Sequence, residues 1–293
     1  MITGVWVPLV TPFQDGRVDF KSLRRLIDHY IAKGVDGLFP LGTTGEVRTL
    51  DNDEFDSVVA ETIGAVRGRA PILVGAGGNA SNKVVKSLER LERFDFDGIV
   101  SVCPYYNRPT QDGLKQHFTA IANATDRQVL IYNIPYRTSV NLANDTLLEL
   151  AEIPNIVGAK DSSGSITQSF DLLARKRTDF SVLTGEDHLF FTMLCNGAQG
   201  GILASSHIAT ELFVELAQFA EENNYHAAHA CWRKLQHIVP LLFQEANPMP
   251  IKHCLWRQGL IASPECRLPL TSVSAALADQ LDLVLKEVEL SAG

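Results

Sequence analysis

Residues 155–164, NIVGAKDSSG, form an apolar run that ends abruptly at Lys160. A lone charge is costly to bury, and a buried lysine commonly avoids that cost by losing its proton. A neutral lysine amine is a nucleophile that adds to a ketone and forms a Schiff base. The alternative is a lysine at a strand end whose ammonium group reaches solvent. The surroundings of Lys160 decide between these two interpretations.

Tyr132 favours the nucleophile. It stands near the end of the preceding apolar run, residues 128–134. Side chains alternate along a strand, so Ile156, Gly158 and Lys160 share one face, and neighbouring strands lie about 4.8 Å apart. We therefore expect the Lys160 amine and the Tyr132 phenol to lie within reach of one another, with Gly158 leaving room for the lysine or a substrate. A phenol beside an amine suits proton transfer in carbonyl chemistry.

A glycine-rich loop supplies a candidate anion site. Residues 42–46, GTTGE, place Thr43 and Thr44 between two glycines. Such a loop can present consecutive backbone N–H groups to an anion. The lysine of a phosphate-binding P-loop is missing, which favours a carboxylate. An ordinary glycine-rich turn is the alternative.

Eight short apolar runs are typical of strands buried on both faces. They are residues 4–10, 37–42, 71–77, 98–104, 128–134, 155–160, 180–185 and 200–205. Segments with helical periodicity and polar caps lie between them, for example residues 20–34 and 51–66. This alternation predicts an α/β fold, a (β/α)₈ barrel over residues 1–222, with a doubly wound sheet as the competing architecture. Residues 223–293 show helical patterns and predict a small C-terminal helical appendage.

Polar and reactive groups cluster where the predicted strands end, which is where the chemistry of such a barrel takes place. They are residues 42–46, 105–107, 132–133, 160–161 and 185–187. The starts of the predicted strands carry no comparable set. This asymmetry predicts an active site on one rim of the barrel.

Composition excludes several classes of partner. The chain of 293 residues has a formal net charge of −8, which argues against nucleic acid or an anionic membrane as a partner. Its start lacks the basic region of a signal peptide. The five cysteines include no CxxC pair, which fits a reducing compartment and excludes common zinc-ribbon patterns. We therefore expect a cytoplasmic protein.

Eight motifs, in order through nearly the whole chain, resemble those of the dihydrodipicolinate synthase/N-acetylneuraminate lyase family. They are VTPF (10–13), GTTGE (42–46), PYYNRP (104–109), YNIPYR (132–137), GAKDSSG (158–164), TGED (184–187), NPMPIK (247–252) and RLPL (267–270). The resemblance implies a (β/α)₈ barrel with a helical C-terminal domain, usually a homotetramer built as a dimer of dimers. It also implies a lysine Schiff base to a 2-oxo acid, most often pyruvate.

The resemblance implies a role for each catalytic residue. Lys160 would form the Schiff base, and Tyr132 would donate and accept protons. Thr43 would relay protons between Tyr132 and Tyr106, with Tyr106 contributed across the dimer interface. No metal or organic cofactor is expected, because the protonated imine is itself the electron sink.

The resemblance also implies a set of substrate-binding residues. Thr44 and Gly45 would hold the pyruvate carboxylate, and Gly185 and Ile202 would lie beside the substrate. Arg137 would bind the carboxylate of the second substrate, because a guanidinium group can bind a carboxylate through two hydrogen bonds. A surface ion pair is the alternative for this arginine.

The identity of the second substrate stays open. Tyr136, Ser139 and the segments 161–163 and 203–207 depart from the synthase pattern. All of them border the expected space for the second substrate. Condensation of pyruvate with aspartate semialdehyde is the leading interpretation. The alternative is cleavage or dehydration of another hydroxy-2-oxo acid or sugar-derived oxo acid.

The resemblance also makes a prediction about regulation. Lysine-inhibited members hold the effector at the dimer interface with histidine and glutamate side chains. The matching positions here are Val47, Arg48, Asn52, Phe55 and Lys83, with Asn79 and Tyr105 retained. The ammonium group of an effector would meet the like charge of Lys83. We therefore expect no feedback inhibition by lysine.

The remaining signals in the sequence are weaker. Residues 75–80 fit GxGxxA, which indicates a nicotinamide dehydrogenase, but that fingerprint belongs on a first βαβ unit. His226 and His229 form HxxH without the glutamate of a metalloprotease motif, which favours surface histidines over a metal site. His207 is a candidate for lining the substrate pocket. A non-catalytic member of the fold would lack the lysine or the tyrosine.

Overall fold

The computed structural model describes residues 1–291, with side chains described through residue 286. The chain divides into two compact units. The central unit comprises Met1–Thr3 and Leu73–Ile202, and the terminal unit comprises Gly4–Ile72 and Leu203–Gly293. The expected boundary at residue 222 between a barrel and a helical appendage stays a prediction.

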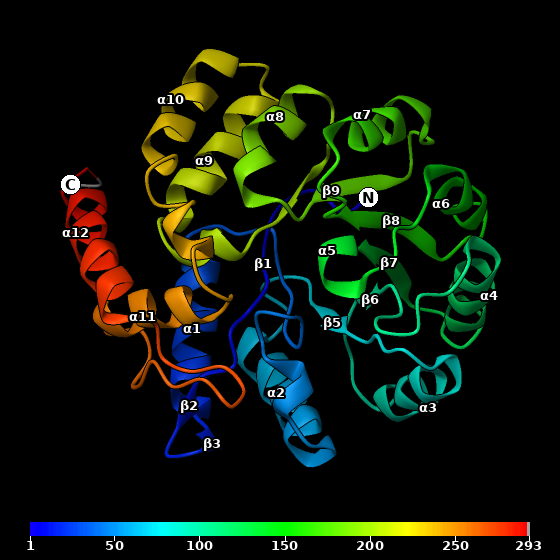
Figure 1. The fold of residues 1–293 in the computed structure, drawn as a ribbon, viewed down its shortest axis with the longest axis horizontal. Coiled ribbons are helices and arrows are strands. Elements are labelled where there is room, and N and C mark those ends of the chain that lie inside the picture. Colours follow the sequence, from blue (N-terminus) through cyan, green and yellow to red (C-terminus); the bar gives the residue numbers. More distant parts are fainter. Residues whose placement is uncertain (292–293) are drawn as a thin grey trace. The chain divides into compact units, whose positions relative to one another are not determined.

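The central unit is built from six parallel strands that pair in chain order. They are β5 (Leu73–Gly75), β6 (Gly98–Val102), β7 (Gln128–Asn133), β8 (Ile156–Asp161), β9 (Ser181–Thr184) and β10 (Gly200–Ile202). The connecting helices are α3 (Ser81–Leu91), α4 (Gln111–Ala122), α5 (Pro135–Thr138), α6 (Asn144–Leu150), α7 (Ile166–Arg175) and α8 (Phe190–Cys195), with the 3₁₀ turn η2 (Asp187–Leu189). Helices α3, α4, α6 and α7 lie side by side along these strands (Figure 1).

The register of the central strands positions Lys160. On β7 and β8, Tyr132 is paired with Lys160, and on β9 the partner of Lys160 is Leu183. Almost every residue of β8 is buried, as expected for a parallel strand covered on both faces. The Lys160 side chain therefore leaves the backbone inside the sheet, near the carboxyl ends of the strands.

The terminal unit joins the first strands to the C-terminal helices. Strands β1 (Gly4–Val7) and β4 (Gly37–Leu38) pair in parallel. The helices are α1 (Phe20–Ala32), α2 (Asn52–Val66), α9 (Thr210–Glu221), α10 (Tyr225–Leu235), α11 (Met249–Arg257) and α12 (Ala275–Ser291), with 3₁₀ turns η1 (Val47–Thr49), η3 (Ala204–His207) and η4 (Leu241–Phe243). Asp51 and Glu54 form a capping box that fixes the start of α2.

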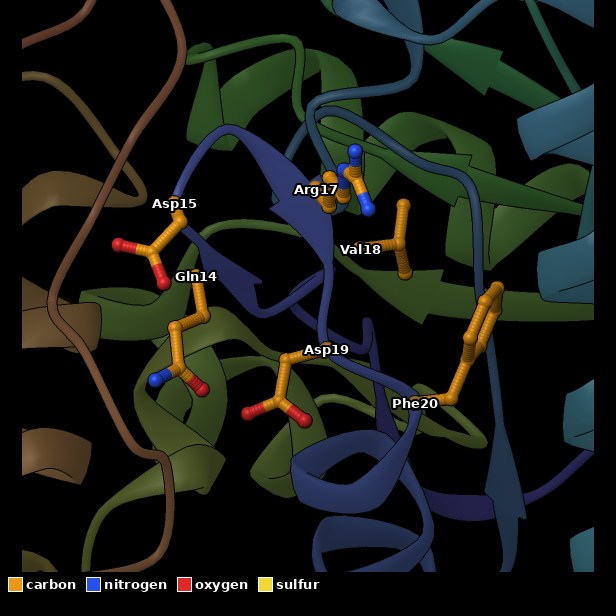
Figure 2. A pocket seen from close by; sticks show the side chains of 6 residues that line it. All are labelled: Gln14, Asp15, Arg17, Val18, Asp19 and Phe20. Carbon is orange, nitrogen blue, oxygen red and sulfur yellow. The ribbon is translucent and has the colours of Figure 1, made fainter.

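A short hairpin that is not among the predicted strands precedes α1. Strands β2 (Phe13–Gln14) and β3 (Arg17–Val18) pair in antiparallel fashion. Asp15 and Gly16 have φ of 52° and 74°, the left-handed conformations that a two-residue Asp-Gly turn requires. Figure 2 shows the hairpin with Asp15 at its tip, beside an open hollow that also borders the start of α1.

All eight predicted strands are present, and seven of them are shorter than predicted. The run at residues 37–42 contributes only Gly37–Leu38 to a strand. Pro40 lacks an N–H group and cannot extend a ladder of hydrogen bonds. The helices predicted after residue 222 are present as α10, α11 and α12. Within the described residues, no helix is both long and apolar enough to cross a membrane.

Candidate active site

Lys160 and Tyr132 meet at the carboxyl ends of β8 and β7. The Lys160 Nζ lies 4.3 Å from the centroid of the Tyr132 ring. Each residue is only 6% exposed. The structure therefore brings the amine and the phenol together, as strand alternation predicts, and removes both from bulk water.

Burial activates the lysine. It lowers the pKa of Lys160 to about 8, although the nearby carboxylates of Asp187 and Glu186 oppose that shift. An ordinary lysine has a pKa of about 10.4, so at neutral pH this amine is unprotonated in roughly a tenth of molecules instead of fewer than one in a thousand. The neutral amine is the nucleophile that carbonyl chemistry needs.

Burial has the opposite consequence for the phenol. It raises the pKa of Tyr132 well above the ordinary value of 10, because the phenolate is poorly solvated there. The hydroxyl therefore stays protonated at neutral pH and is available to donate a proton. The neutral amine can add to a ketone to form a carbinolamine, and the protonated phenol can donate the proton needed when the carbinolamine loses water.

A glycine makes room for the lysine side chain, but it is Gly185 rather than Gly158. A Cβ atom at Gly185 would lie 2.5 Å from the Lys160 Cε and 2.2 Å from the Ser162 Oγ. At Gly158, a Cβ atom would lie 2.4 Å from the carbonyl oxygen of Ser181. The space at Gly158 is filled by backbone, so the expectation that it leaves room for lysine or substrate is wrong.

Two acidic residues, Glu186 and Asp187, follow Gly185, and the sequence alone assigns neither of them a role. Glu186 has a pKa raised to about 7, first by burial and then by the charges of Asp187 and Asp161. Its Oε1 atom is buried and has no hydrogen-bond partner among the described residues. Two carboxylates directly after a predicted strand, on the rim that carries Lys160, were the signal that could have identified them.

Arg137 follows Tyr132 on the short helix α5, which begins with Pro135 at its first position. Its side chain is exposed, with the guanidinium carbon 5.7 Å from the centroid of the Tyr136 ring. Its charge helps to lower the pKa of Lys160. Among residues 1–286, the guanidinium group forms no ion pair with a carboxylate, which disfavours the surface ion-pair alternative.

Ile202 and Tyr106 complete the central-unit candidates. Ile202 ends β10 and is buried. Tyr106, in the loop after β6, is 88% exposed and has a φ of 75°. A left-handed backbone is uncommon for a bulky residue and carries a conformational cost. The loop accepts that cost while the aromatic ring of Tyr106 is exposed to solvent.

The glycine-rich loop lies in the terminal unit, where hydrogen bonds hold it on several sides. Thr44 is buried and Thr43 is half-buried. Asn247 donates to the Thr44 Oγ1 across 2.9 Å, and the Thr11 hydroxyl donates to the Gly45 carbonyl across 2.7 Å. A Cβ atom at Gly45 would lie 3.0 Å from the carbonyl oxygen of Leu9, so a side chain there would crowd the backbone.

The histidine candidates from the sequence, His207, His226 and His229, are either bonded to backbone groups or exposed on a helix. His207 is 1% exposed and accepts a hydrogen bond from the Val10 N–H at Nε2, while Nδ1 lies 2.9 Å from the Ala204 carbonyl. Both ring nitrogens are engaged with backbone, so His207 holds the chain rather than lining a pocket. His226 and His229 are exposed on α10. Among the described side chains, no group of three acidic, histidine or cysteine residues is arranged to hold a metal ion.

A parallel α/β fold with a buried, partly unprotonated lysine and a phenol at its strand ends defines a class I lyase, an enzyme that forms a Schiff base with its substrate. The chain belongs to the dihydrodipicolinate synthetase family, whose model matches residues 1–288. This match confirms the resemblance drawn from the eight motifs.

Similar proteins support the same family. The 4-hydroxy-tetrahydrodipicolinate synthase 2 of Clostridium acetobutylicum is 46% identical over 284 residues, which cover 97% of this chain and 99% of the relative. The dihydrodipicolinate synthase structure from Thermotoga maritima is 38% identical with a TM-score of 0.96 and covers 99% of both chains. The pyruvate complex of the chloride-inhibited enzyme from Acinetobacter baumannii is 36% identical with a TM-score of 0.96, again over 99% of both chains. The fold is therefore the (β/α)₈ barrel with a helical C-terminal part.

Proposed function

We propose that the chain is a 4-hydroxy-tetrahydrodipicolinate synthase that condenses pyruvate with aspartate semialdehyde through a Schiff base at Lys160. The observation that carries this proposal is the buried Lys160 amine 4.3 Å from the Tyr132 ring. The relative from Clostridium acetobutylicum, which bears that name, supports the choice of reaction.

The neutral Lys160 amine attacks the keto carbon of pyruvate, and the carbinolamine loses water to give an imine. The Tyr132 hydroxyl supplies the proton that the departing oxygen needs. The protonated imine draws electrons from the neighbouring methyl group, which loses a proton and becomes an enamine. That enamine carbon attacks the aldehyde, and the new aldehyde oxygen takes up a proton. The amino group of the second substrate then attacks the imine carbon and closes the ring, and the bond from that carbon to Lys160 breaks to release the product and restore the neutral amine.

The remaining residues hold and serve these intermediates. Thr43 passes protons from Tyr132 toward Tyr106 of the partner subunit. Thr44 and Gly45 bind the pyruvate carboxylate, since a buried hydroxyl and a loop of N–H groups suit that anion. Two further substrate contacts come from Gly185, which directly follows β9, and Ile202, which ends β10.

Arg137 binds the carboxylate of the second substrate. Its guanidinium group is exposed and, among residues 1–286, free of ion pairs with acidic residues, so its charge is available to an incoming anion. Removal of this residue is the sharpest way to separate the synthase reaction from other Schiff-base reactions.

The assembly and setting of the enzyme belong to the same proposal. We expect a homotetramer in the cytoplasm that needs no metal or organic cofactor, with residues 1–222 as the barrel and 223–293 as the appendage. The outward-held ring of Tyr106 supports a contact between subunits. A solved relative of this fold is a monomeric dihydrodipicolinate synthase variant, 37% identical. The number of subunits must therefore be determined from the mass of the assembly in solution.

One comparison of substrates tests the function. Turnover should occur with pyruvate plus aspartate semialdehyde and should exceed turnover with a panel of hydroxy-2-oxo acids and sugar-derived oxo acids. If only the panel compounds react, the synthase reaction is wrong, while Schiff-base chemistry at Lys160 survives. No borohydride-stable adduct with any 2-oxo acid would overturn both.

The pH dependence of imine formation should reflect the lowered pKa of Lys160. Because only the neutral amine attacks, the rate should rise about tenfold per pH unit below pH 8 and level off above it. The measurement is the initial rate of pyruvate adduct formation between pH 6 and 9.5, stopped with borohydride. A rate that still climbs tenfold between pH 8.5 and 9.5 would indicate an ordinary lysine and contradict this prediction.

Lysine should not inhibit the enzyme. Lys83 lies exposed in the first turn of α3, where its ammonium group repels that of an amino acid. One solved relative, from Cyanidioschyzon merolae, is a dihydrodipicolinate synthase with lysine bound, so the family can bind it. We expect less than a twofold change in rate at millimolar lysine. Strong inhibition at that concentration would show that the interface accepts lysine despite Lys83.

A further inference from the structure

Asn247 is a buried residue that none of the roles above includes. It lies just before α11 and is 9% exposed. Its Nδ2 donates to the Thr44 Oγ1 across 2.9 Å, although 203 positions separate the two residues. Its Oδ1 atom is buried and has no hydrogen-bond partner among the described residues.

A second contact between the same segments fixes the loop independently. Lys252, on α11, donates to the Glu46 carboxylate and also to the Glu265 carbonyl across 2.8 Å. The N–H group of Arg267 donates to the same carboxylate across 2.9 Å. Glu46 is thus anchored by a buried ion pair that does not involve Thr44. These contacts hold the loop in place without Asn247, so the bond from Asn247 to Thr44 is not needed for that role.

The chemistry of a hydroxyl group indicates that purpose. A threonine hydroxyl both donates and accepts, and its hydrogen rotates to suit its neighbours. Because Asn247 donates to the Thr44 oxygen, one acceptor position is filled, and the hydroxyl hydrogen is turned away from the amide. A carboxylate can only accept, so it needs that hydrogen presented to it.

We propose that Asn247 is a positioning residue that orients the Thr44 hydroxyl as a donor to the carboxylate of the 2-oxo acid. The inference rests on the proposed function, in which Thr44 binds that carboxylate. It assigns to the C-terminal part of the chain a direct influence on substrate affinity, exerted through one hydrogen bond.

Two variants of Asn247 test the role. Asn247→Ala removes the donor and should raise the half-saturating pyruvate concentration for borohydride trapping roughly five- to tenfold, with a smaller effect on the maximal rate. Asn247→Asp keeps the shape but lacks the N–H donor, and its carboxylate would accept the Thr44 hydrogen and repel pyruvate. At pH 8, Asn247→Asp should therefore raise the half-saturating pyruvate concentration, relative to the unaltered protein, more than Asn247→Ala does. This increase should become smaller toward pH 5, where the introduced carboxyl group gains a proton.

A matched control separates positioning from stability. Asn144, in the central unit, is also buried, also donates through Nδ2 and also has an Oδ1 without a partner among the described residues. Asn144→Ala should lower the melting temperature without changing the half-saturating pyruvate concentration. In a Thr44→Val background, Asn247→Ala should add no further loss of affinity, because the hydroxyl it orients is gone.

The outcomes divide cleanly. Unchanged pyruvate saturation in Asn247→Ala, while the unaltered protein is trapped normally, would overturn this inference and leave the proposed function intact. If Asn247→Ala and Asn247→Asp raise the half-saturating pyruvate concentration equally at every pH, the residue has only a structural role, and the inference is also overturned. Failure of the unaltered protein to trap pyruvate would overturn the proposed function and the inference together.

Discussion

The Lys160→Ala variant should lose both turnover and pyruvate labelling, down to the background of buffer alone. In the unaltered protein, pyruvate with borohydride should add one reduced pyruvyl group to the peptide that contains Lys160, as measured by mass spectrometry. The loss is complete because the imine bond is formed by this amine and the neighbouring phenol cannot replace it. Removing a buried ammonium group costs the fold little, since the burial that lowers its pKa already disfavours the charge.

A control lysine makes this prediction specific. Lys176, also in the central unit, follows α7 and donates to the Phe180 carbonyl across 3.0 Å. Lys176→Ala should label and turn over at the unaltered rate. Labelling of a different peptide, or normal turnover in Lys160→Ala, would disprove the mechanism. Retained melting behaviour in Lys160→Ala would exclude unfolding as the reason for inactivity.

Local patterns were sufficient to predict the pairing of Lys160 with Tyr132. Parallel strands have a fixed spacing and alternate their side chains, so two residues at the ends of consecutive buried runs must lie close together. The glycine that serves the lysine could not be identified in this way. Gly158 shares the strand with Lys160, whereas Gly185 approaches it from the end of the next strand. That approach depends on the register of β8 with β9.

Contacts between segments far apart in the sequence were beyond prediction. The bond from Asn247 to Thr44 and the ion pair of Lys252 with Glu46 depend on how α11 packs in the terminal unit. Composition and periodicity carry no information about such packing. His207 was a candidate for lining the substrate pocket. The structure uses its two ring nitrogens to satisfy backbone groups instead.

The pKa shifts of the charged groups in the site could not be predicted from the sequence either. Glu186 titrates near neutral pH because burial and two other carboxylates act on it at once. Its motif was visible as TGED, but the burial that changes its chemistry was not. For Lys160, the sequence favoured a nucleophile over an ammonium group in solvent, but it did not show the burial that lowers the pKa of the amine. Burial, which only the fold determines, separates these alternatives.

Replacing Arg137 with alanine should separate the two halves of the reaction. With pyruvate and aspartate semialdehyde as substrates, we expect Arg137→Ala to cost roughly 2–5 kcal/mol of transition-state binding, about a 30- to 5,000-fold loss of kcat/KM. Much of that cost comes from leaving the carboxylate of the second substrate unpaired. Arg137→Lys should recover only part of the loss, because an ammonium group lacks the planar fork that binds a carboxylate through two hydrogen bonds.

Pyruvate trapping supplies the internal control for this prediction. Lys160 and the glycine-rich loop are unaltered in Arg137→Ala, so its borohydride labelling should saturate within about twofold of the unaltered protein. The pKa of Lys160 should rise slightly, because the arginine charge helps to lower it. Tyr136→Phe, next to the arginine, keeps the charge and should retain most of the synthase activity. Full synthase activity in Arg137→Ala would show that another group binds the second carboxylate, and the assignment of Arg137 would then be wrong.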